Sequence, residues 1–119
     1  MLPAAQTDTS VVKAALAAAG VAPGERVLEI GPGTGVLTAA LLAAGARVTA
    51  LEKDSALADA LRANNAELVA SGALTVVHDD VLRWLRNGGA AAAFPDAPPG
   101  APLAKARVLL QARSACAGS

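Results

Sequence analysis

The stretch EIGPGTG, Glu29 to Gly35, joins a short run of Val, Leu and Ile to a longer run of Ala and Leu. Its glycines alternate with other residues, so the backbone there must turn tightly or be approached closely by another group. The residues before the turn, VLEI at Val27–Ile30, are apolar and partly β-branched, which is typical of a buried strand. Thr34–Ala44 has the composition of a helix, and Gly45 ends it. The stretch therefore predicts a strand, a tight turn and a helix.

Similar patterns recur on both sides of this unit. The further helices and strands that we expect are a helix over Asp8–Ala19, a strand over Arg47–Leu51, a helix over residues 53–72, a strand over Leu74–Val77 and a short helix over Val81–Arg86. The resulting order, αβαβαβ, favours a parallel sheet with helices on its faces and right-handed crossovers.

The pattern changes after residue 86. Asn87–Pro102 is rich in Gly, Ala and Pro and has no periodicity, so we predict a loop or a disordered insert there. ARVLLQA, Ala106–Ala112, has the pattern of one further buried strand. We therefore divide the chain into a folded core over residues 1–86, a low-complexity insert over 87–105, and a final strand with an irregular tail over 106–119.

Composition limits the function classes. The chain has 119 residues, which indicates one small domain, and its net charge is zero, so it has no basic field to concentrate nucleic acid non-specifically. The single cysteine, Cys116, cannot form an internal disulfide, which fits a reducing compartment. The longest uncharged stretch, Ile30–Ala46, is short and is interrupted by Pro32 and glycines, so we expect no membrane span. We also expect no secretory signal.

The glycine turn has three interpretations. A bare strand-to-helix turn needs no ligand, but such a turn rarely needs three glycines. A dinucleotide-binding turn has the pattern G-x-G-x-x-G, and here the third glycine would fall on Val36. The carboxylate of Glu29 would also repel a pyrophosphate, whereas it suits a cation. S-adenosylmethionine fits this turn, since it carries an ammonium group and a sulfonium.

Acidic residues also end the next two predicted strands. Glu52 follows Gly31 by 21 residues, and a carboxylate there can accept two hydrogen bonds from a ribose diol. Asp79 and Asp80 end the third strand, where a carboxylate can accept a bond from an adenine amino group. The plainer interpretation is a helix cap, which applies well to Asp54 and to one of Asp79 and Asp80.

Two motifs, VLEIGPGTGVLT and ALEKD, resemble those of the ribosomal RNA adenine N6,N6-dimethyltransferases, and the resemblance runs from about Gln6 to Trp84. That family places two methyl groups on N6 of adjacent adenines in small-subunit RNA, with S-adenosylmethionine as donor. The resemblance implies an α/β, Rossmann-like S-adenosylmethionine-dependent methyltransferase fold. Its parallel sheet would be incomplete, with helices on both faces and strand order 3-2-1-4.

The resemblance also implies a set of cofactor-binding residues. The glycine turn would lie against the cofactor, Glu52 would bind the ribose and Asp80 the adenine amino group, with Asp79 at a variable position beside it. The full implied set is Gln6, Glu29, Gly31, Gly33, Gly35, Glu52 and Asp80. Gln6 stands where the family's opening Gln-Asn-Phe-Leu-like segment ends.

The base-holding half of the family's site has no counterpart in this sequence. The family's catalytic loop is Asn-Leu-Pro-Tyr or Asn-Leu-Pro-Phe, and neither string occurs here. We therefore assign no catalytic residue, interpret the chain as a truncated member, and expect its activity to be impaired. Two alternatives are a methyltransferase of the same fold acting on a small molecule or a protein, and a non-catalytic fragment that holds the cofactor or a partner protein.

Other expectations concern partners and single residues. The implied partner is small-subunit ribosomal RNA, and we expect a monomer without a metal. The Ala- and Pro-rich insert and ALEKD are similar to plastid members, so we favour a plastid over the cytoplasm. We interpret His78 as a polar strand-end residue, and Trp84, which lies near Val81 and Leu85, as part of the core.

Overall fold

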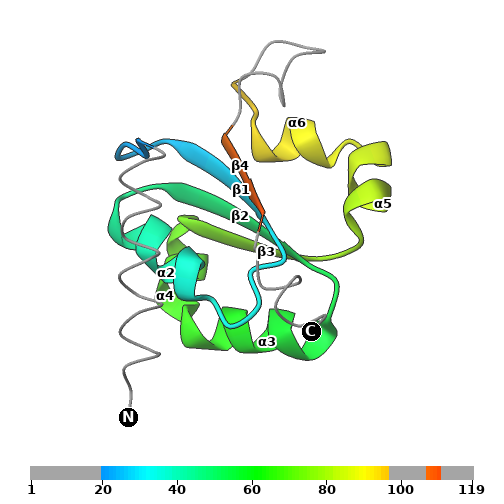
Figure 1. The fold of residues 1–119 in the computed structure, drawn as a ribbon, viewed down its shortest axis with the longest axis horizontal. Coiled ribbons are helices and arrows are strands. Elements are labelled where there is room, and N and C mark those ends of the chain that lie inside the picture. Colours follow the sequence, from blue (N-terminus) through cyan, green and yellow to red (C-terminus); the bar gives the residue numbers. More distant parts are fainter. Residues whose placement is uncertain (1–19, 97–106, 111–119) are drawn as a thin grey trace.

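The computed structural model describes residues 20–96 and 107–110 (Figure 1). The helices and strands within these ranges are β1 (Arg26–Ile30), α2 (Val36–Ala43), β2 (Arg47–Glu52), α3 (Ser55–Asn64), α4 (Ala66–Ser71), β3 (Leu74–His78), α5 (Val81–Arg86), α6 (Gly89–Ala93) and β4 (Arg107–Leu110). The helix predicted over Asp8–Ala19 lies outside the described residues, as do Gln6 and Cys116. The strands predicted around residues 27, 47, 74 and 107 are confirmed.

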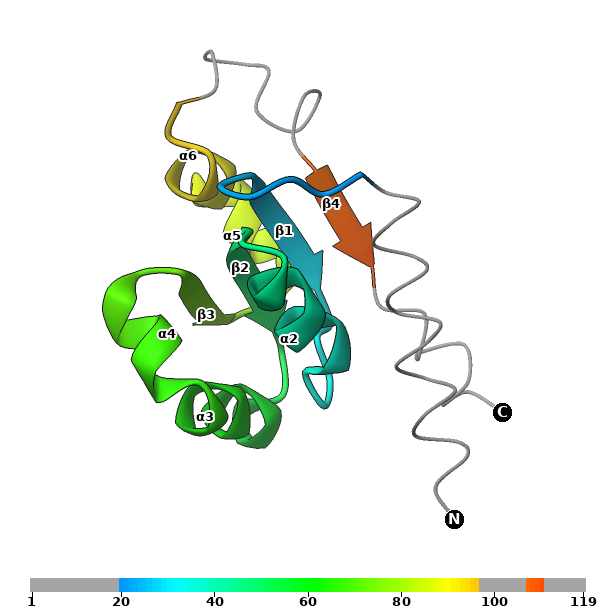
Figure 2. The same ribbon diagram turned by 90° about the vertical axis from the view of Figure 1, so that its left-hand side faces the viewer.

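The described strands form one parallel sheet in the order β3-β2-β1-β4 (Figure 2). This is the predicted order. The register pairs Val27 of β1 with Val48 of β2, and Val48 with Leu74 of β3. Parallel strands in this register end at the same edge of the sheet, so the residues that follow β1, β2 and β3 are brought together.

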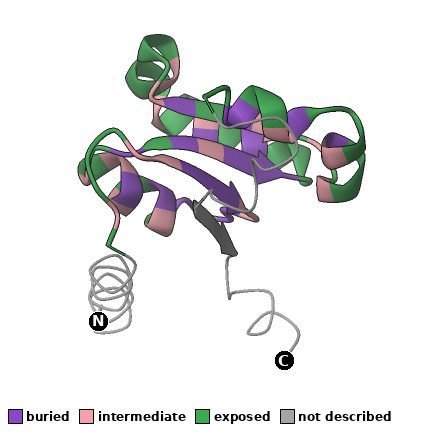
Figure 3. Ribbon diagram, turned by 90° about the horizontal axis from the view of Figure 1, so that it is seen from above, coloured by how far each residue is buried: buried purple, intermediate pink, exposed green. Residues whose placement is uncertain are grey.

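Most of β1 and β2 is buried (Figure 3), and two apolar clusters lie on the two faces of the sheet. Neighbouring residues of a strand point to opposite faces, and Val27 and Leu28 accordingly belong to different clusters. On the face of Val27, α2 and α3 contribute Leu41 and Leu61. On the face of Leu28 lies Trp84 of α5, which confirms its predicted place in the core. Helices therefore cover both faces, as expected.

The long helix predicted over residues 53–72 is divided into α3 and α4. The break lies at Asn65, whose φ of −132° and ψ of 36° are not helical. The side-chain amide of Asn65 donates a hydrogen bond to the Leu61 carbonyl oxygen at 2.8 Å. Asparagine side chains compete in this way for backbone partners, so Asn65 gives the break a local cause. Gly72, with a φ of 87°, ends α4 where the sequence predicts an end.

The prediction of a loop or a disordered insert over residues 87–102 is wrong at its start. Gly89–Ala93 forms α6, and Ala93 and the following Phe94 are buried against Trp84. Alanine is the best helix former, and Phe94 supplies apolar area that holds this segment on the sheet. The division of the chain at residues 86 and 105 stays a prediction. Among the described helices, none is long and apolar enough to span a bilayer.

Candidate functional site

The glycine turn joins β1 to α2 with its backbone in the left-handed region at each glycine. The φ angles are 73° at Gly31, 59° at Gly33 and 89° at Gly35. The Gly31 amide donates to the Leu51 carbonyl oxygen at 2.9 Å, which ties the turn to β2. Other residues rarely adopt this conformation, so the backbone alone requires these glycines. The case for a ligand therefore depends on the side chains around the turn.

Gly35→Ala should destabilise the protein by about 1–2 kcal/mol from its backbone conformation alone. An added Cβ would also lie 2.9 Å from Cδ1 of Leu61 on α3, so that side chain must shift. Urea unfolding measures the loss. Gly72→Ala is a matched control, because Gly72 has a φ of 87° and nothing within 4 Å of an added Cβ. An equal loss in the two variants would contradict a close contact between the turn and α3.

Glu29, the fourth residue of β1, is buried beneath the turn with no exposed surface. Its carboxylate accepts a hydrogen bond from Oγ1 of Thr38, which is equally buried on α2. Thr38 was not among the predicted site residues. The sequence does place this threonine on the first turn of an apolar helix, nine positions after Glu29. That placement could have identified it as a partner of the acid.

Glu52, the last residue of β2, connects the turn to the strand ends. Its Oε1 accepts from the Gly33 amide at 3.2 Å, and its Oε2 accepts from the Asp54 amide at 2.9 Å. The side chain is only 5% exposed. A carboxylate has about four acceptor positions, so each oxygen retains capacity for a further donor such as a ribose hydroxyl.

The pairing register places both glutamates on one face of the sheet. Glu29 lies opposite Ala50, and Ala50 and Glu52 point to the same side because strand side chains alternate. This is the face covered by α2 and α3. The structure therefore brings together Glu52 and the glycine turn by direct contact, with Glu29 on the same face beneath the turn.

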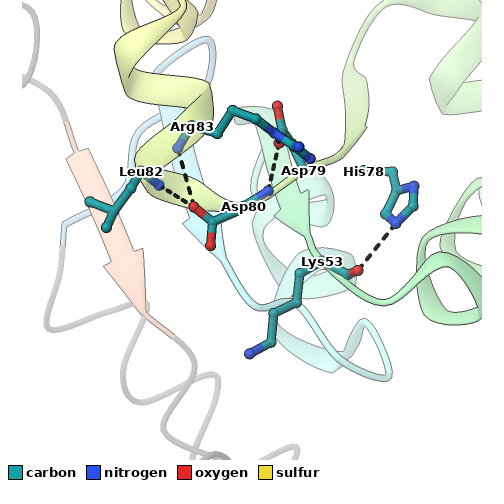
Figure 4. A network of polar contacts seen from close by, with 6 residues as sticks. All are labelled: Lys53, His78, Asp79, Asp80, Leu82 and Arg83. Carbon is teal, nitrogen blue, oxygen red and sulfur yellow. Dashed lines mark hydrogen bonds and ion pairs between the residues drawn. The ribbon is translucent and has the colours of Figure 1, made fainter.

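The two aspartates after β3 have different partners (Figure 4). Asp80 is the N-cap of α5, and its Oδ1 accepts from the amides of Leu82 and Arg83 at 2.9 and 3.1 Å. The helix-cap interpretation therefore applies to Asp80, which the resemblance made the adenine ligand. The cap contacts use only Oδ1, so the adenine role of Oδ2 stays a prediction.

Asp79 is joined to the rest of the site through the backbone. Its amide donates to the Glu52 carbonyl oxygen at 3.1 Å, which holds the end of β3 beside the end of β2. Its side chain pairs with Nε of Arg83 at 2.6 Å. This hydrogen bond holds the pKa of Asp79 below its ordinary value of 3.8.

A depressed pKa stabilises the folded state above the unfolded pKa, and this stability is lost as the pH falls through the folded value. Asp79→Asn should therefore reduce the unfolding midpoint slightly at pH 6, and the difference from the parent should shrink as the pH falls below 3.8 and vanish below the lowered pKa of the folded state. Arg83 is exposed and Asp79 is partly exposed, so 1 M NaCl should shrink the effect. A difference that grows towards low pH would contradict this assignment.

The remaining polar residues nearby show no catalytic arrangement. His78 is exposed, and its Nε2 lies 3.1 Å from the Lys53 carbonyl oxygen, as its interpretation as a strand-end residue predicts. Asp54 caps α3 by accepting from the Leu57 amide at 3.0 Å, again as predicted. Within the described ranges, His, Cys, Asp and Glu side chains form no group of three or more that could hold a metal ion.

The family model described as ribosomal RNA adenine dimethylase matches residues 6–88, which include the glycine turn and all three strand ends. The chain belongs to this family. The prediction from the sequence motifs is thereby confirmed.

Curated relatives agree with this membership. The ribosomal RNA small subunit methyltransferase A of Leifsonia xyli is 51% identical over 77 residues, which are 63% of this chain and 28% of the relative. The protein of the same name from Deinococcus radiodurans is 49% identical over 75 residues, covering 63% and 24%. The one from Mycobacterium tuberculosis is 48% identical over 87 residues, covering 71% and 27%. The chain spans about a quarter of the length of these relatives.

Solved structures confirm the methyltransferase fold. A dimethyladenosine transferase from Plasmodium falciparum superposes with a TM-score of 0.51 at 28% identity, covering 62% of this chain and 26% of that one. A putative RNA methyltransferase from Pyrococcus horikoshii gives 0.53 at 32% identity, covering 62% and 36%. The glycopeptide N-methyltransferase MtfA, solved with sinefungin, gives 0.51 at 35% identity, covering 60% and 29%.

Proposed function

We propose that this chain is the cofactor-binding part of an S-adenosylmethionine-dependent ribosomal RNA (adenine-N6,N6)-dimethyltransferase that acts on small-subunit RNA. The single observation that carries the proposal is the position of Glu52. Its nearly buried carboxylate at the end of β2 binds the backbone of the glycine turn and keeps acceptor capacity for a diol. Membership in the adenine dimethylase family supports the substrate class.

The described residues fit an adenosine with a cationic substituent. Glu52 would accept the ribose hydroxyls, and the backbone at Gly31 and Gly33 would lie against the ligand. Oδ2 of Asp80 would accept from the adenine amino group while Oδ1 caps α5. Glu29 would contribute negative charge beneath the turn, where low dielectric strengthens its attraction for a cation. Gln6, outside the described residues, would complete the set by family resemblance.

The donor, when bound, supplies an electrophilic methyl group for transfer to an adenine nitrogen. The chain's own residues hold the donor at the strand ends, so the main contribution of this part is positioning. The accepting base has to leave its stack to reach a site at the sheet edge. In the family, the contacts that hold the base come from the Asn-Leu-Pro-aromatic loop. The 119 residues contain no such motif.

Calorimetry with the 119-residue chain tests the cofactor half of the proposal. We expect S-adenosylmethionine to bind and NAD not to bind, because Glu29 would repel its pyrophosphate and Val36 stands where a dinucleotide-binding turn has its third glycine. Absence of S-adenosylmethionine binding would overturn the proposal. A second assay measures transfer of labelled methyl groups to small-subunit RNA. Binding without transfer would favour the non-catalytic, cofactor-holding alternative for this chain.

A further inference from the structure

A buried polar pair, Glu29 and Thr38, connects the two ends of the glycine turn. Glu29 lies just before the turn on β1, and Thr38 lies just after it on α2. Neither side chain has exposed surface, and the Thr38 hydroxyl donates to the Glu29 carboxylate. The pair therefore holds the strand and the helix together directly under the segment that would approach the ligand.

Packing alone does not explain this pair. Burying a carboxylate is costly, and an apolar pair of similar shape at such a position is often as stable or more stable. Leu41, one turn further along α2, is equally buried and fills the same core with an entirely apolar side chain. A carboxyl group kept beneath the turn therefore suggests that the group itself has a use there.

The hydroxyl of Thr38 gives that group a defined position. A carboxylate held by a donor on a helix cannot rotate freely, so its negative end stays fixed relative to the backbone of the turn. The surrounding core is apolar, with Val27, Ala50 and Leu41 also buried on this face. In such surroundings a fixed charge acts on a nearby cation more strongly than an exposed one would.

We propose that Thr38 is a positioning residue for the cofactor: it holds the buried Glu29 carboxylate beneath the glycine turn, where the carboxylate attracts the cationic end of S-adenosylmethionine. This inference rests on the proposed function and assigns to Thr38 a part in it. The inference assigns no such role to Thr34, which is exposed within the turn itself.

The test compares three variants of the 119-residue chain. Thr38→Val keeps the shape and removes the hydroxyl, whereas Thr38→Ser keeps the hydroxyl and removes a methyl group. Thr49→Val on β2 is the control for losing a threonine hydroxyl outside the site. Calorimetry measures the dissociation constant for S-adenosylmethionine, and urea unfolding measures the folded fraction of each variant under the same conditions.

We expect Thr38→Val to weaken binding about tenfold, because the Glu29 carboxylate would lose the donor that fixes it beneath the turn. Thr38→Ser should bind within about threefold of the parent, and Thr49→Val like the parent. The inference is overturned if Thr38→Val binds normally, if serine does not restore affinity, or if Thr38→Val unfolds outright, which would make the residue a structural one. A parent chain that does not bind S-adenosylmethionine overturns the proposed function instead.

Discussion

Glu52→Gln should weaken S-adenosylmethionine binding about 10- to 100-fold, the range expected for hydrogen bonds to a charged group. The parent carboxylate accepts from two backbone amides and retains acceptor capacity on both oxygens. A glutamine in the same position can accept on one side only. Its amide group would then face either the Gly33 amide or the Asp54 amide, donor against donor, and the side chain would no longer be held at the strand ends. Calorimetry at constant salt measures the change.

The control for this variant is Glu67→Gln. Glu67 is exposed on the first turn of α4, and its substitution removes the same charge from the chain without touching the strand ends. We expect this control to bind S-adenosylmethionine like the parent. If Glu52→Gln also bound like the parent while its unfolding midpoint fell, Glu52 would serve only to tie the turn to β2, and its assignment to the ribose would be wrong.

The strands and the glycine turn were predictable because each depends on local, strongly patterned sequence, whereas the strand order came from the family resemblance. Val27–Ile30 and Leu74–Val77 are short apolar runs bounded by polar or turn-forming residues, and alternation with helices restricts the sheet to a parallel one. The left-handed backbone at Gly31, Gly33 and Gly35 follows from glycine's freedom. Glu52 was predictable for a related reason. It ends the second predicted strand, and the carboxyl ends of parallel strands lie at the same edge of the sheet as the turn.

Other features depend on contacts between distant segments, which no local pattern shows. Asp79 and Asp80 are neighbouring residues of the same type. Only the direction of α5 makes Asp80 the helix cap and Asp79 the partner of Arg83. The role of Thr38 depends on its reaching back to Glu29 across the turn. The Ala-rich segment of α6 lacks periodicity, so its burial became apparent only from the packing of Phe94 beside Trp84.

Gly89→Ala should have the largest effect on stability among these variants, and it tests the packing of α6. A Cβ on Gly89 would lie well inside 3.0 Å of three indole atoms of Trp84, closer than real Cβ atoms approach. The indole is rigid and is itself packed on Leu28 and Leu51, so α6 has to move away. The loss is limited by the burial that α6 supplies, mainly that of Phe94, which is about 3 kcal/mol.

Fluorescence distinguishes this loss from a general one, because Trp84 is the only tryptophan in the chain. Its emission should shift to longer wavelength in Gly89→Ala under conditions where the rest of the protein stays folded. Gly88→Ala is the neighbouring control: its φ of 84° gives it a backbone cost, but an added Cβ meets nothing within 4 Å. It should therefore lose some stability and keep the parent emission. If both variants kept that emission and lost equal stability, α6 would not pack on Trp84, and residues 89–93 would be the loop that their composition predicts.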